Sequence, residues 1–498
     1  MKTIFSVSAS PAGIAAWSGG CLRGHSDTAV SAACTDSREA GPGVMFCAIR
    51  GERADGHAYI ASAYAAGSRC FLCEHCPTEA EIGTMYPDAC FICVPDTVAA
   101  LPPLAAGFRS EYLRGMRVVA VTGSVGKTTT KGLCASVLST ALPTFCREGN
   151  YNSVIGMPLC VPGIGTENSA AVLEMGMSAR GEISAMSRAV CPDIAVITNI
   201  GSSHLESLGT RENIARAKLE VLDGMRRGGH LLFDGDEPLL RAQAAHARGD
   251  ILLHPVSRRD SGADFRAFHV RAEAGGTFFD LRLPNGDVWE GLHVPAPGEH
   301  ILSDAVYAAG VGFLCGLDRE QTARGLADYR PAAMRQTLHT VGGITVVEDC
   351  YNASPESVRA ALNTLQLLSG SDGRHMALLG DMKELGTDTA ALHRSVGAAC
   401  AGRLDCLWTV GALGAEIAAG ARDAGMSRVY PLYADGTEPD AEEVAAGITA
   451  GLASGDVLLI KASRAMRLET AADAILRILA QRNNRQFAID SCRKGDRY

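Results

Sequence analysis

The sequence lacks long apolar runs and an excess of positive charge, and both absences narrow its possible functions. No apolar run approaches the roughly 20 residues that a transmembrane helix needs, which excludes insertion into a membrane. The N-terminal segment has one lysine but no unbroken apolar stretch, so a secretory signal peptide is not expected. The 55 acidic residues outnumber the 46 Lys and Arg, which gives a formal net charge of −9, whereas a non-specific nucleic-acid binder needs a basic surface. We therefore expect a soluble cytoplasmic protein without nucleic-acid partners.

Cysteine, by contrast, is abundant, but the 17 cysteines are odd in number and scattered over 498 residues. Such a distribution does not make the compact disulfide framework of a short secreted chain, and it indicates a reducing compartment. Cys70, Cys73 and Cys76, followed by Cys90 and Cys93, come near the spacing of zinc ligands. The two Cys-x-x-Cys pairs lie in apolar runs that predict strands, in which residues i and i+3 face opposite sides. Buried free thiols are therefore expected in place of a zinc site.

The length suggests three domains, at about 150 residues for each. Residues 1–97 mix short apolar runs with loops, whereas strands, turns and helices alternate from Val118 to about Leu240 as βαβ units do. Residues 251–295 differ, because Phe265 to Val294 alternate polar and apolar side chains around a Pro-Asn-Gly-Asp turn, which predicts an antiparallel insert. Residues 330–498 resume the alternation and predict a second doubly wound domain. The expected fold class is α/β with three domains.

A glycine-rich segment at residues 122–129 has the features of a phosphate-binding loop. It follows the apolar run 118–122 and precedes a helical stretch that ends by Leu142. Glycines let backbone N–H groups turn toward a phosphate, and the helix N-terminus adds partial positive charge. The Lys127 ammonium can reach the terminal phosphates, and the Thr128 hydroxyl can ligate Mg²⁺.

The match to the general phosphate-loop pattern is incomplete, because Val121 occupies the place of its first glycine. The alternative interpretation is an ordinary Gly/Ser turn that happens to carry a lysine. Strand, loop and helix agree, however, so the segment predicts binding of a nucleoside triphosphate with Mg²⁺. The predicted nucleotide-binding residues of the loop are Thr122, Gly123, Ser124, Val125, Gly126, Lys127, Thr128 and Thr129.

Further segments with distinctive residues follow one another along most of the chain. In chain order they are residues 36–38, 55–57, 122–128, 173–176, 198–206, 217–220, 348–355, 379–386 and 461–464. Together they resemble the Mur ligases of peptidoglycan synthesis. The resemblance implies a UDP-muramoyl-peptide-binding domain at residues 1–97, a central ATP-binding domain at 98–329, and a C-terminal Rossmann-like domain at 330–498 for the incoming dipeptide.

Two of these segments distinguish members of the family. Tyr351-Asn352-Ala353-Ser354-Pro355 and the Gly-Asp-Met-Lys-Glu-Leu-Gly run at 380–386 resemble the member that adds D-alanyl-D-alanine to a UDP-N-acetylmuramoyl tripeptide. The implied reaction is ATP-dependent amide ligation through an acyl phosphate, in cell-wall precursor synthesis that serves cell shape and division. A relative that adds another amino acid or dipeptide is the alternative. A non-catalytic homologue is a further one, although it is expected to lose some of Lys127, Glu174, His204 and Lys218, and all four are present.

The resemblance also implies the metal ligands. Thr128 and Glu174 are expected to hold one Mg²⁺, and His204 and Lys218 a second, with Lys218 carbamylated so that it carries oxygen ligands. From the residues alone, Glu174 could equally be a solvated glutamate at a strand end. His204 could be an ordinary loop histidine, and Lys218 an ordinary lysine on a helix surface.

Other roles follow from the same resemblance. Arg335 is expected to reach the γ-phosphate when the C-terminal domain closes, and Asp349 and Asn352 to lie at the ribose and adenine side. Lys461 and Arg464 are candidates for holding the carboxylate of the dipeptide, for which the guanidinium fork is suited. The remaining expected substrate contacts are Ser37, Arg38, Asn150 and Asn152.

Two positions depart from the family pattern at the nucleotide site, where Ile301 and Asp304 replace two asparagines. The resemblance implies that the second asparagine contacts adenine, and an ionised Asp accepts hydrogen bonds but cannot donate them. We therefore expect a weaker preference for ATP over other triphosphates. The implied substrates are small molecules, and the protein is expected to be a monomer.

Overall fold

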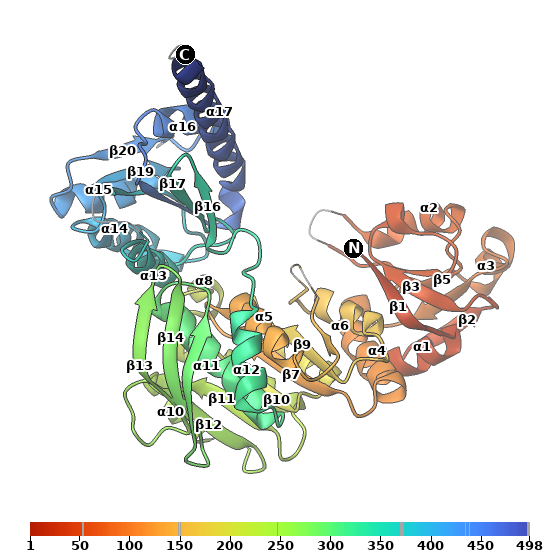
Figure 1. Cartoon of the computed structure of the whole chain (residues 1–498). Coiled ribbons are helices and arrows are strands. Elements are labelled where there is room, and N and C mark those ends of the chain that lie inside the picture. Colours follow the sequence, from red (N-terminus) through yellow and green to blue (C-terminus); the bar gives the residue numbers. More distant parts are fainter. Residues whose placement is uncertain are drawn as a thin grey trace.

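The computed structural model describes residues 1–51, 54–147, 149, 151–246, 248–368, 373–433, 435–437 and 439–495, with side chains up to residue 484. Three sheets follow one another along the chain, and each organises one of three α/β bodies. Figure 1 shows them as a red N-terminal body, an orange-to-green central body and a blue C-terminal body above the central one. Among the described residues, no helix is both long enough and apolar enough to cross a bilayer.

The N-terminal sheet has six strands, of which the inner four are parallel and the two edge strands antiparallel. Its strand order is β1 (Lys2–Ala9), β3 (Val30–Cys34), β4 (Val44–Cys47), β5 (Cys70–Cys73), β6 (Cys90–Cys93) and β2 (Cys21–Gly24). The helices of this body are α1 (Pro11–Ser18), α2 (Ile60–Ala65) and α3 (Glu79–Met85). The inner strands are buried along almost their whole length, as parallel strands covered on both faces are.

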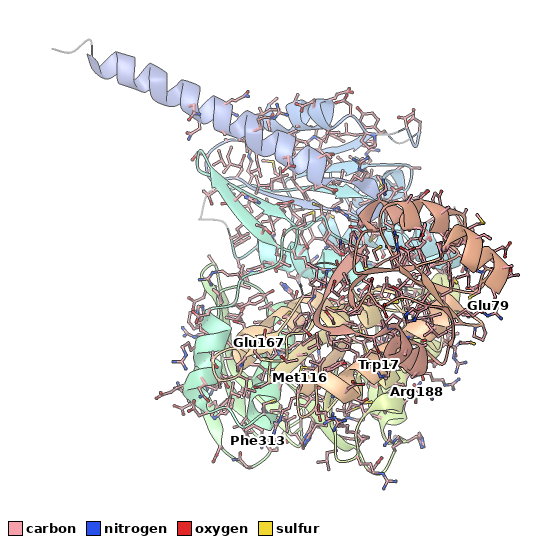
Figure 2. All side chains as sticks on the ribbon, turned by 90° about the vertical axis from the view of Figure 1, so that its right-hand side faces the viewer. Trp17, Glu79, Met116, Glu167, Arg188 and Phe313 are labelled. Atoms are coloured by element: carbon pink, nitrogen blue, oxygen red, sulfur yellow. A yellow bond between two sulfur atoms is a disulfide. The ribbon has the colours of Figure 1, made fainter. Side chains whose placement is uncertain are left out.

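The helix α4 (Thr97–Tyr112) joins the N-terminal body to the central one. It packs against α1 on one side and against α7 (Glu182–Val190) on the other. Trp17 meets Phe108 edge to face, with ring centroids 5.9 Å apart. A Cβ atom on Gly107 would lie 2.2 Å from the Trp17 ring, so this close approach requires glycine. Figure 2 labels Trp17 and Met116, which both lie where the two bodies adjoin.

The central sheet has nine strands and begins as a parallel sheet. Its order is β15, β14, β13, β12, β11, β10, β7, β9 and β8. The parallel strands are β7 (Arg117–Thr122), β8 (Thr144–Phe145), β9 (Ala170–Glu174), β10 (Ile194–Ile197), β11 (His230–Asp234) and β12 (Leu252–Ser257). The helices are α5 (Lys127–Leu138), α6 (Gly156–Cys160), α7, α8 (Leu205–Leu208), α9 (Arg211–Leu219), α10 (Pro238–Ala244), α11 (Glu299–Leu314) and α12 (Arg319–Ala327).

The antiparallel insert is shorter than predicted. β12 pairs in parallel with β11, so the antiparallel pairing of this sheet involves only β13 (Phe265–Glu273), β14 (Gly276–Arg282) and β15 (Val288–Val294). Residues 251–257 belong instead to the parallel part, because their backbone completes the ladder of β11. The predicted hairpin turn is confirmed between β14 and β15, where Gly286 has a φ of +90°.

The C-terminal body repeats the doubly wound pattern, as predicted. Its sheet has the order β16 (Thr337–Val341), β17 (Ile344–Glu348), β21 (Val457–Lys461), β18 (His375–Gly380), β19 (Cys406–Val410) and β20 (Val429–Leu432), and only β16 is antiparallel. The helices are α13 (Pro355–Leu365), α14 (Thr389–Cys400), α15 (Gly414–Asp423), α16 (Ala441–Thr449) and α17 (Glu469–Gly495). The far end of α17 extends beyond the rest of the body (Figure 2).

The three bodies are joined in two different ways. One cluster of buried apolar side chains runs without a break from the N-terminal sheet through α4 to one face of the central sheet. The clusters of the C-terminal body stay within that body among the described residues, one on each face of its sheet. The N-terminal body is therefore anchored by an apolar core that it shares with the central body, whereas the C-terminal body is not.

The cysteine prediction is partly wrong. Cys70 and Cys73 do lie in β5, and Cys90 and Cys93 in β6, as the apolar runs predicted. Cys93, however, forms a disulfide with Cys76, which lies in the loop after β5. Sequence reasoning missed this bond because the parallel pairing of β5 and β6 brings the ends of both strands together, and that pairing is a tertiary feature.

Replacing Cys76 by serine should lower the free energy of local opening of the β5–β6 region by about 3 kcal/mol. The reason is that the disulfide closes a loop over a sequence separation of 17. Hydrogen–deuterium exchange of peptides from these two strands measures the effect. Cys21→Ser makes the same chemical change at an exposed free thiol on β2 and should leave the exchange unchanged. Equal protection in the two variants would contradict the prediction.

Candidate active site

The phosphate loop lies at the carboxyl end of β7, where the parallel strands of the central sheet end together. Gly123 and Gly126 have φ values of +148° and +85°, which favour glycine. A Cβ atom on Gly123 would lie 1.8 Å from the Thr198 hydroxyl, and one on Gly126 would lie 2.7 Å from a carboxylate oxygen of Asp304. Both glycines are therefore required by close packing as well as by conformation.

The first turn of α5 provides the donors of an anion site. Its N-cap is Gly126, and no side chain caps the helix, so the N–H groups of its first turn have no side-chain acceptor. The Lys127 ammonium lies back across the loop, where it donates to the carbonyl oxygens of Gly123 at 2.9 Å and Ser124 at 3.3 Å. Burial lowers the pKa of Lys127. This arrangement can receive the phosphates of a nucleotide.

The loop is fixed from the side by the segment that follows β10. Asn199 accepts a hydrogen bond from the Val125 N–H at 3.0 Å and donates one to the Val125 carbonyl oxygen at 2.9 Å. The Thr198 hydroxyl donates to the same carbonyl oxygen. Sequence analysis assigned no role to Asn199, although it belongs to the Thr-Asn-Ile-Gly run that was singled out.

Glu174 ends β9 beside the loop, as predicted, and it is buried. It accepts hydrogen bonds from the Thr128 hydroxyl and from the Asn152 amide, each at 2.9 Å, and Lys131 lies 3.6 Å away. Burial raises the pKa of Glu174, but the charges of Lys127 and Lys131 and these two hydrogen bonds outweigh it and bring the pKa below its ordinary value. The carboxylate is therefore charged.

Thr128 and Glu174 together fit a Mg²⁺ ion. Mg²⁺ takes oxygen ligands and is commonly held by one or two protein groups together with substrate phosphates and water. The charged Glu174 carboxylate and the Thr128 hydroxyl, which are hydrogen-bonded to each other, supply two such groups. Within the described ranges, no three His, Cys, Asp or Glu side chains are grouped closely enough to hold a metal ion by themselves.

The two residues predicted for a second ion have other surroundings. Lys218 lies in α9 with only 1% of its surface exposed, and it makes no hydrogen bond or ion pair to any described residue. Burial and the charge of Lys127 hold its pKa well below the ordinary value of a lysine. His204 instead contacts Glu384 of the C-terminal body, with 3.1 Å between Nδ1 and Oε2.

A cavity of about 670 Å³ lies between the central and C-terminal bodies, next to the phosphate loop. The predicted nucleotide and γ-phosphate residues that line it are Ser124, Val125, Gly126, Lys127, Thr128, Thr129, Asp304, Arg335, Asp349 and Asn352, and Lys461 joins them. Thr122 and Gly123 lie just outside its lining. Sequence analysis assigned no role to His300, Tyr329 and Glu356, which also line it, because their partners are distant in sequence.

Arg335 enters this cavity from the connection between the two bodies. Its guanidinium lies over the ring of Tyr351, 4.2 Å from the centroid. Met334 and Gln336, on either side, have φ values of +60° and +52°. Two left-handed residues flanking one arginine store strain in this connection, a feature common where a chain changes direction at a functional site.

The two residues expected to hold the dipeptide differ in their surroundings. Lys461 is buried, with its ammonium 2.8 Å from the Asp349 carboxylate and 2.9 Å from the Asn352 carbonyl oxygen. Arg464 is half exposed and forms an ion pair with Glu469 at 3.0 Å. The Lys461 ammonium is therefore held by a buried carboxylate, whereas the Arg464 guanidinium is half exposed and can reach a substrate carboxylate.

The residues expected to contact the UDP substrate do not line the nucleotide cavity. Ser37 and Arg38 form a short 3₁₀ turn in the N-terminal body, where the exposed Arg38 guanidinium binds the Asp36 carboxylate. Asn152 lies on Glu174, as described above, and so adjoins the phosphate loop. Asn150 lies outside the described residues.

Asp304 is buried in α11, where its carboxylate accepts a hydrogen bond from Thr130 at 2.6 Å. Burial raises its pKa to about 7, against opposing contributions from Thr130 and Arg335. Near neutral pH the carboxyl therefore carries a proton part of the time and can then donate a hydrogen bond. The difference in hydrogen bonding between Asp304 and an asparagine is thus smaller than the sequence alone predicts.

Asp304→Asn should stabilise the protein at high pH but not at low pH. An unfolded aspartate titrates near 3.8 and the folded one near 7, so between these values only the folded state holds the proton. Raising the pH through this window therefore lowers the free energy of unfolding of the wild type. Asparagine does not titrate, so the variant does not lose this stability. Its advantage should be nil at pH 4 and about 2–4 kcal/mol above pH 8.

Thermal unfolding of variant and wild type at both pH values measures this difference. Asp328→Asn removes an exposed carboxylate from the same body and should show no pH-dependent gain. An Asp304→Asn gain that is equal at pH 4 and pH 8 would refute the assignment of the raised pKa.

Comparison with known proteins agrees with this geometry over most of the chain. Three family models match successive segments: the Mur ligase family catalytic domain at residues 30–109, the Mur ligase middle domain at 121–312, and the Mur ligase glutamate ligase domain at 334–464. The UDP-N-acetylmuramoyl-tripeptide–D-alanyl-D-alanine ligase of Bacillus subtilis is 36% identical over 456 residues, which are 89% of this chain and 93% of the relative. The Escherichia coli ligase of the same name is 31% identical over 77% of this chain and 82% of its own.

Solved structures give the same result. A crystal structure of MurF from Acinetobacter baumannii has a TM-score of 0.83 at 28% identity and covers 95% of this chain and 99% of its own. The MurF ligase from Thermotoga maritima in complex with ADP has a TM-score of 0.77 at 26% identity, with 90% and 98% covered. With a phosphate loop, a buried carboxylate beside it and a cavity closed by a third α/β body, this chain belongs to the Mur ligase family.

Proposed function

We propose that this protein joins D-alanyl-D-alanine to a UDP-N-acetylmuramoyl tripeptide at the expense of ATP. The observation that carries the proposal is the phosphate loop, whose Lys127 and Thr128 face a cavity that Arg335, Asp349 and Lys461 of the C-terminal body complete. The relatives named for this reaction match the chain over most of its length. A cavity that two bodies build together suits a reaction whose activated acid must be kept from water.

The first step transfers the γ-phosphoryl group of ATP to the terminal carboxylate of the tripeptide. The bond from the γ-phosphorus to its bridging oxygen breaks, ADP leaves, and an acyl phosphate forms. Both reactants are anions, so charge repulsion dominates the barrier. Lys127, the first-turn N–H groups of α5 and Arg335 offset it, and neither cation forms an ion pair with a carboxylate in the described part of the chain.

Mg²⁺, when bound, neutralises further phosphate charge at this site. Thr128 and Glu174 would hold it, and the charges of Lys127 and Lys131 help to keep Glu174 ionised for that role. His204 and Lys218 would hold a second ion, and both lie on the segments that follow β10. Asn152 orients Glu174 through its second carboxylate oxygen.

We extend the proposal to a carbamate on Lys218, because the structure buries this lysine without a counter-ion. Reaction of the amine with CO₂ forms an N–C bond and releases a proton, which exchanges a buried cation for an anion with two oxygen atoms. That exchange removes the repulsion from Lys127 and supplies the oxygen ligands that Mg²⁺ prefers.

In the second step the free amine of the dipeptide attacks the acyl phosphate. A tetrahedral intermediate forms, the C–O bond to phosphate breaks, and inorganic phosphate leaves with the amine proton passed to solvent or base. Arg464 is the better placed of the two candidates for the dipeptide carboxylate, since Lys461 already pairs with Asp349. Lys461 then acts mainly by fixing Asp349 in the nucleotide cavity.

The remaining assignments follow the domain order. Residues 1–97 bind the UDP-muramoyl peptide with Ser37 and Arg38, residues 98–329 bind ATP, and residues 330–498 bind the dipeptide. The protein works in the cytoplasm, where such nucleotide-linked precursors are made. We propose that it works as a monomer.

Phosphate release from ATP should depend on both the UDP-muramoyl tripeptide and D-Ala-D-Ala. A coupled phosphate assay in which D-Ala-D-Ala, D-Ala-D-Ser, D-Ala-D-Lac and single amino acids are exchanged measures this dependence. Stimulation by a single amino acid alone would favour the alternative, a relative that adds a different amine. The same assay with GTP tests nucleotide preference: a strict requirement for ATP would refute the relaxed selectivity expected from Asp304.

Lys218→Ala should lose at least about 100-fold in ligase rate, because the variant lacks the proposed metal ligand. Short carboxylates such as acetate or formate should restore part of the rate by occupying the vacated space with an anionic oxygen. Lys131→Ala, which removes a neighbouring cation, should gain nothing from carboxylates. Full activity of Lys218→Ala without additive would refute the role of this lysine.

A further inference from the structure

The segment from Thr198 to His204 touches both the phosphate loop and the C-terminal body. At its start, Thr198 and Asn199 hold the Val125 peptide group of the loop. At its end, Ser202 donates to the Glu356 carboxylate and His204 pairs with Glu384, and both carboxylates belong to the C-terminal body. Two acidic side chains of one body therefore hold a single short segment of the other.

The His204–Glu384 contact is built at a cost to the backbone. His204 has a φ of +68° and Glu384 a φ of +65°, so both residues are left-handed although neither is glycine. Each such residue is strained by about 1–3 kcal/mol and persists only where its surroundings enforce it. The two strained residues lie in loops that face each other, and their side chains are in contact.

The pair is too exposed to hold the bodies together. The His204 side chain is 21% exposed and the Glu384 side chain 63%, and exposed ion pairs contribute about 0–1 kcal/mol. Its consequence is instead orientation, because a neutral imidazole that donates from Nδ1 to a carboxylate presents Nε2 as its acceptor. A histidine that binds a metal commonly depends on such an outer partner.

We propose that Glu384 is a positioning residue, which fixes the His204 ring through Nδ1 and leaves Nε2 to face the metal-and-phosphate site once the C-terminal body is docked. The inference rests on the proposed function, in which His204 is a metal ligand. It adds that the ligand becomes competent only when the two bodies meet. Docking of the C-terminal body and completion of the metal site are then one event.

The chain offers a matched comparison for Glu384. Glu206 lies two residues after His204, in α8 (Leu205–Leu208), and its side chain is exposed. Among the described residues it makes no side-chain hydrogen bond, so its carboxylate does not hold the His204 ring.

The test is the affinity of the full chain for Mn²⁺ in the presence of a non-hydrolysable ATP analogue, read by electron paramagnetic resonance of free Mn²⁺. Glu384→Ala should weaken Mn²⁺ binding about 10-fold, as His204→Ala should. Glu384→Gln retains an acceptor for Nδ1–H and should stay within about twofold of the wild type. Glu206→Gln should bind as the wild type does.

The double variant decides whether Glu384 acts through His204. If it does, His204→Ala with Glu384→Ala should bind Mn²⁺ no more weakly than His204→Ala alone. Additive losses, or wild-type affinity in Glu384→Ala, would overturn the proposal. Phosphate release by the wild type on D-Ala-D-Ala tests the proposed function separately, so the positioning role can fail while the ligase activity stands.

Discussion

The site depends on the register of three neighbouring parallel strands. Val121 of β7 lies opposite Glu174 of β9, and Thr122 lies opposite Ile197 of β10, so all three strands end at one edge. That register delivers the phosphate loop, the Glu174 carboxylate and the Thr198–His204 segment to one place. The strands are so close there that only glycine fits at position 123. A shift of one residue in any of them would turn each end residue to the opposite face and disperse the site.

The N-terminal and C-terminal bodies are joined to the central body by different kinds of contact. The N-terminal body shares an apolar cluster with the central one through α4, and separating them would expose that surface to water. The C-terminal body meets the central body near the phosphate loop through polar pairs, among them Ser202–Glu356 and His204–Glu384. Polar pairs that water can replace make and break at little cost. A rigid joint on one side and a reversible one on the other suit a cavity that must open for ADP and close over an acyl phosphate.

Sequence reasoning succeeded where a structure is encoded locally. The phosphate loop, the strands that end in Glu174 and at Ile197, and the hairpin at Gly286 each depend on a few adjacent residues. It failed where partners come from distant segments. The Cys76–Cys93 bond, the Lys461–Asp349 pair and the acidic partner of His204 all require knowledge of which strands or bodies adjoin.

The antiparallel insert shows the boundary between these two cases. Alternation of polar and apolar residues marked the strands of residues 265–294, but it could not reveal that β12 joins the parallel ladder. Whether β12 joins the parallel or the antiparallel part depends on its pairing with β11, which is a tertiary feature. Similarly, the sequence around Lys218 predicts a surface lysine on a helix, whereas the tertiary structure buries it. The strongest sequence evidence for these residues was resemblance, since local pattern favoured the ordinary interpretation.

Charge within the cavity explains why so many separate elements converge there. The chain is acidic overall, and the proposed reaction brings a triphosphate next to a carboxylate. Of the cavity's cations, Lys461 is already neutralised by Asp349, which leaves Lys127 and Arg335 without carboxylate partners in the described ranges. In the proposed reaction, a divalent ion held by Thr128 and Glu174 would supply the remaining positive charge. Arg335 lies at the start of the C-terminal body, so the proposed mechanism requires that body to be docked before the charge is balanced. Docking would then also exclude water from the acyl phosphate.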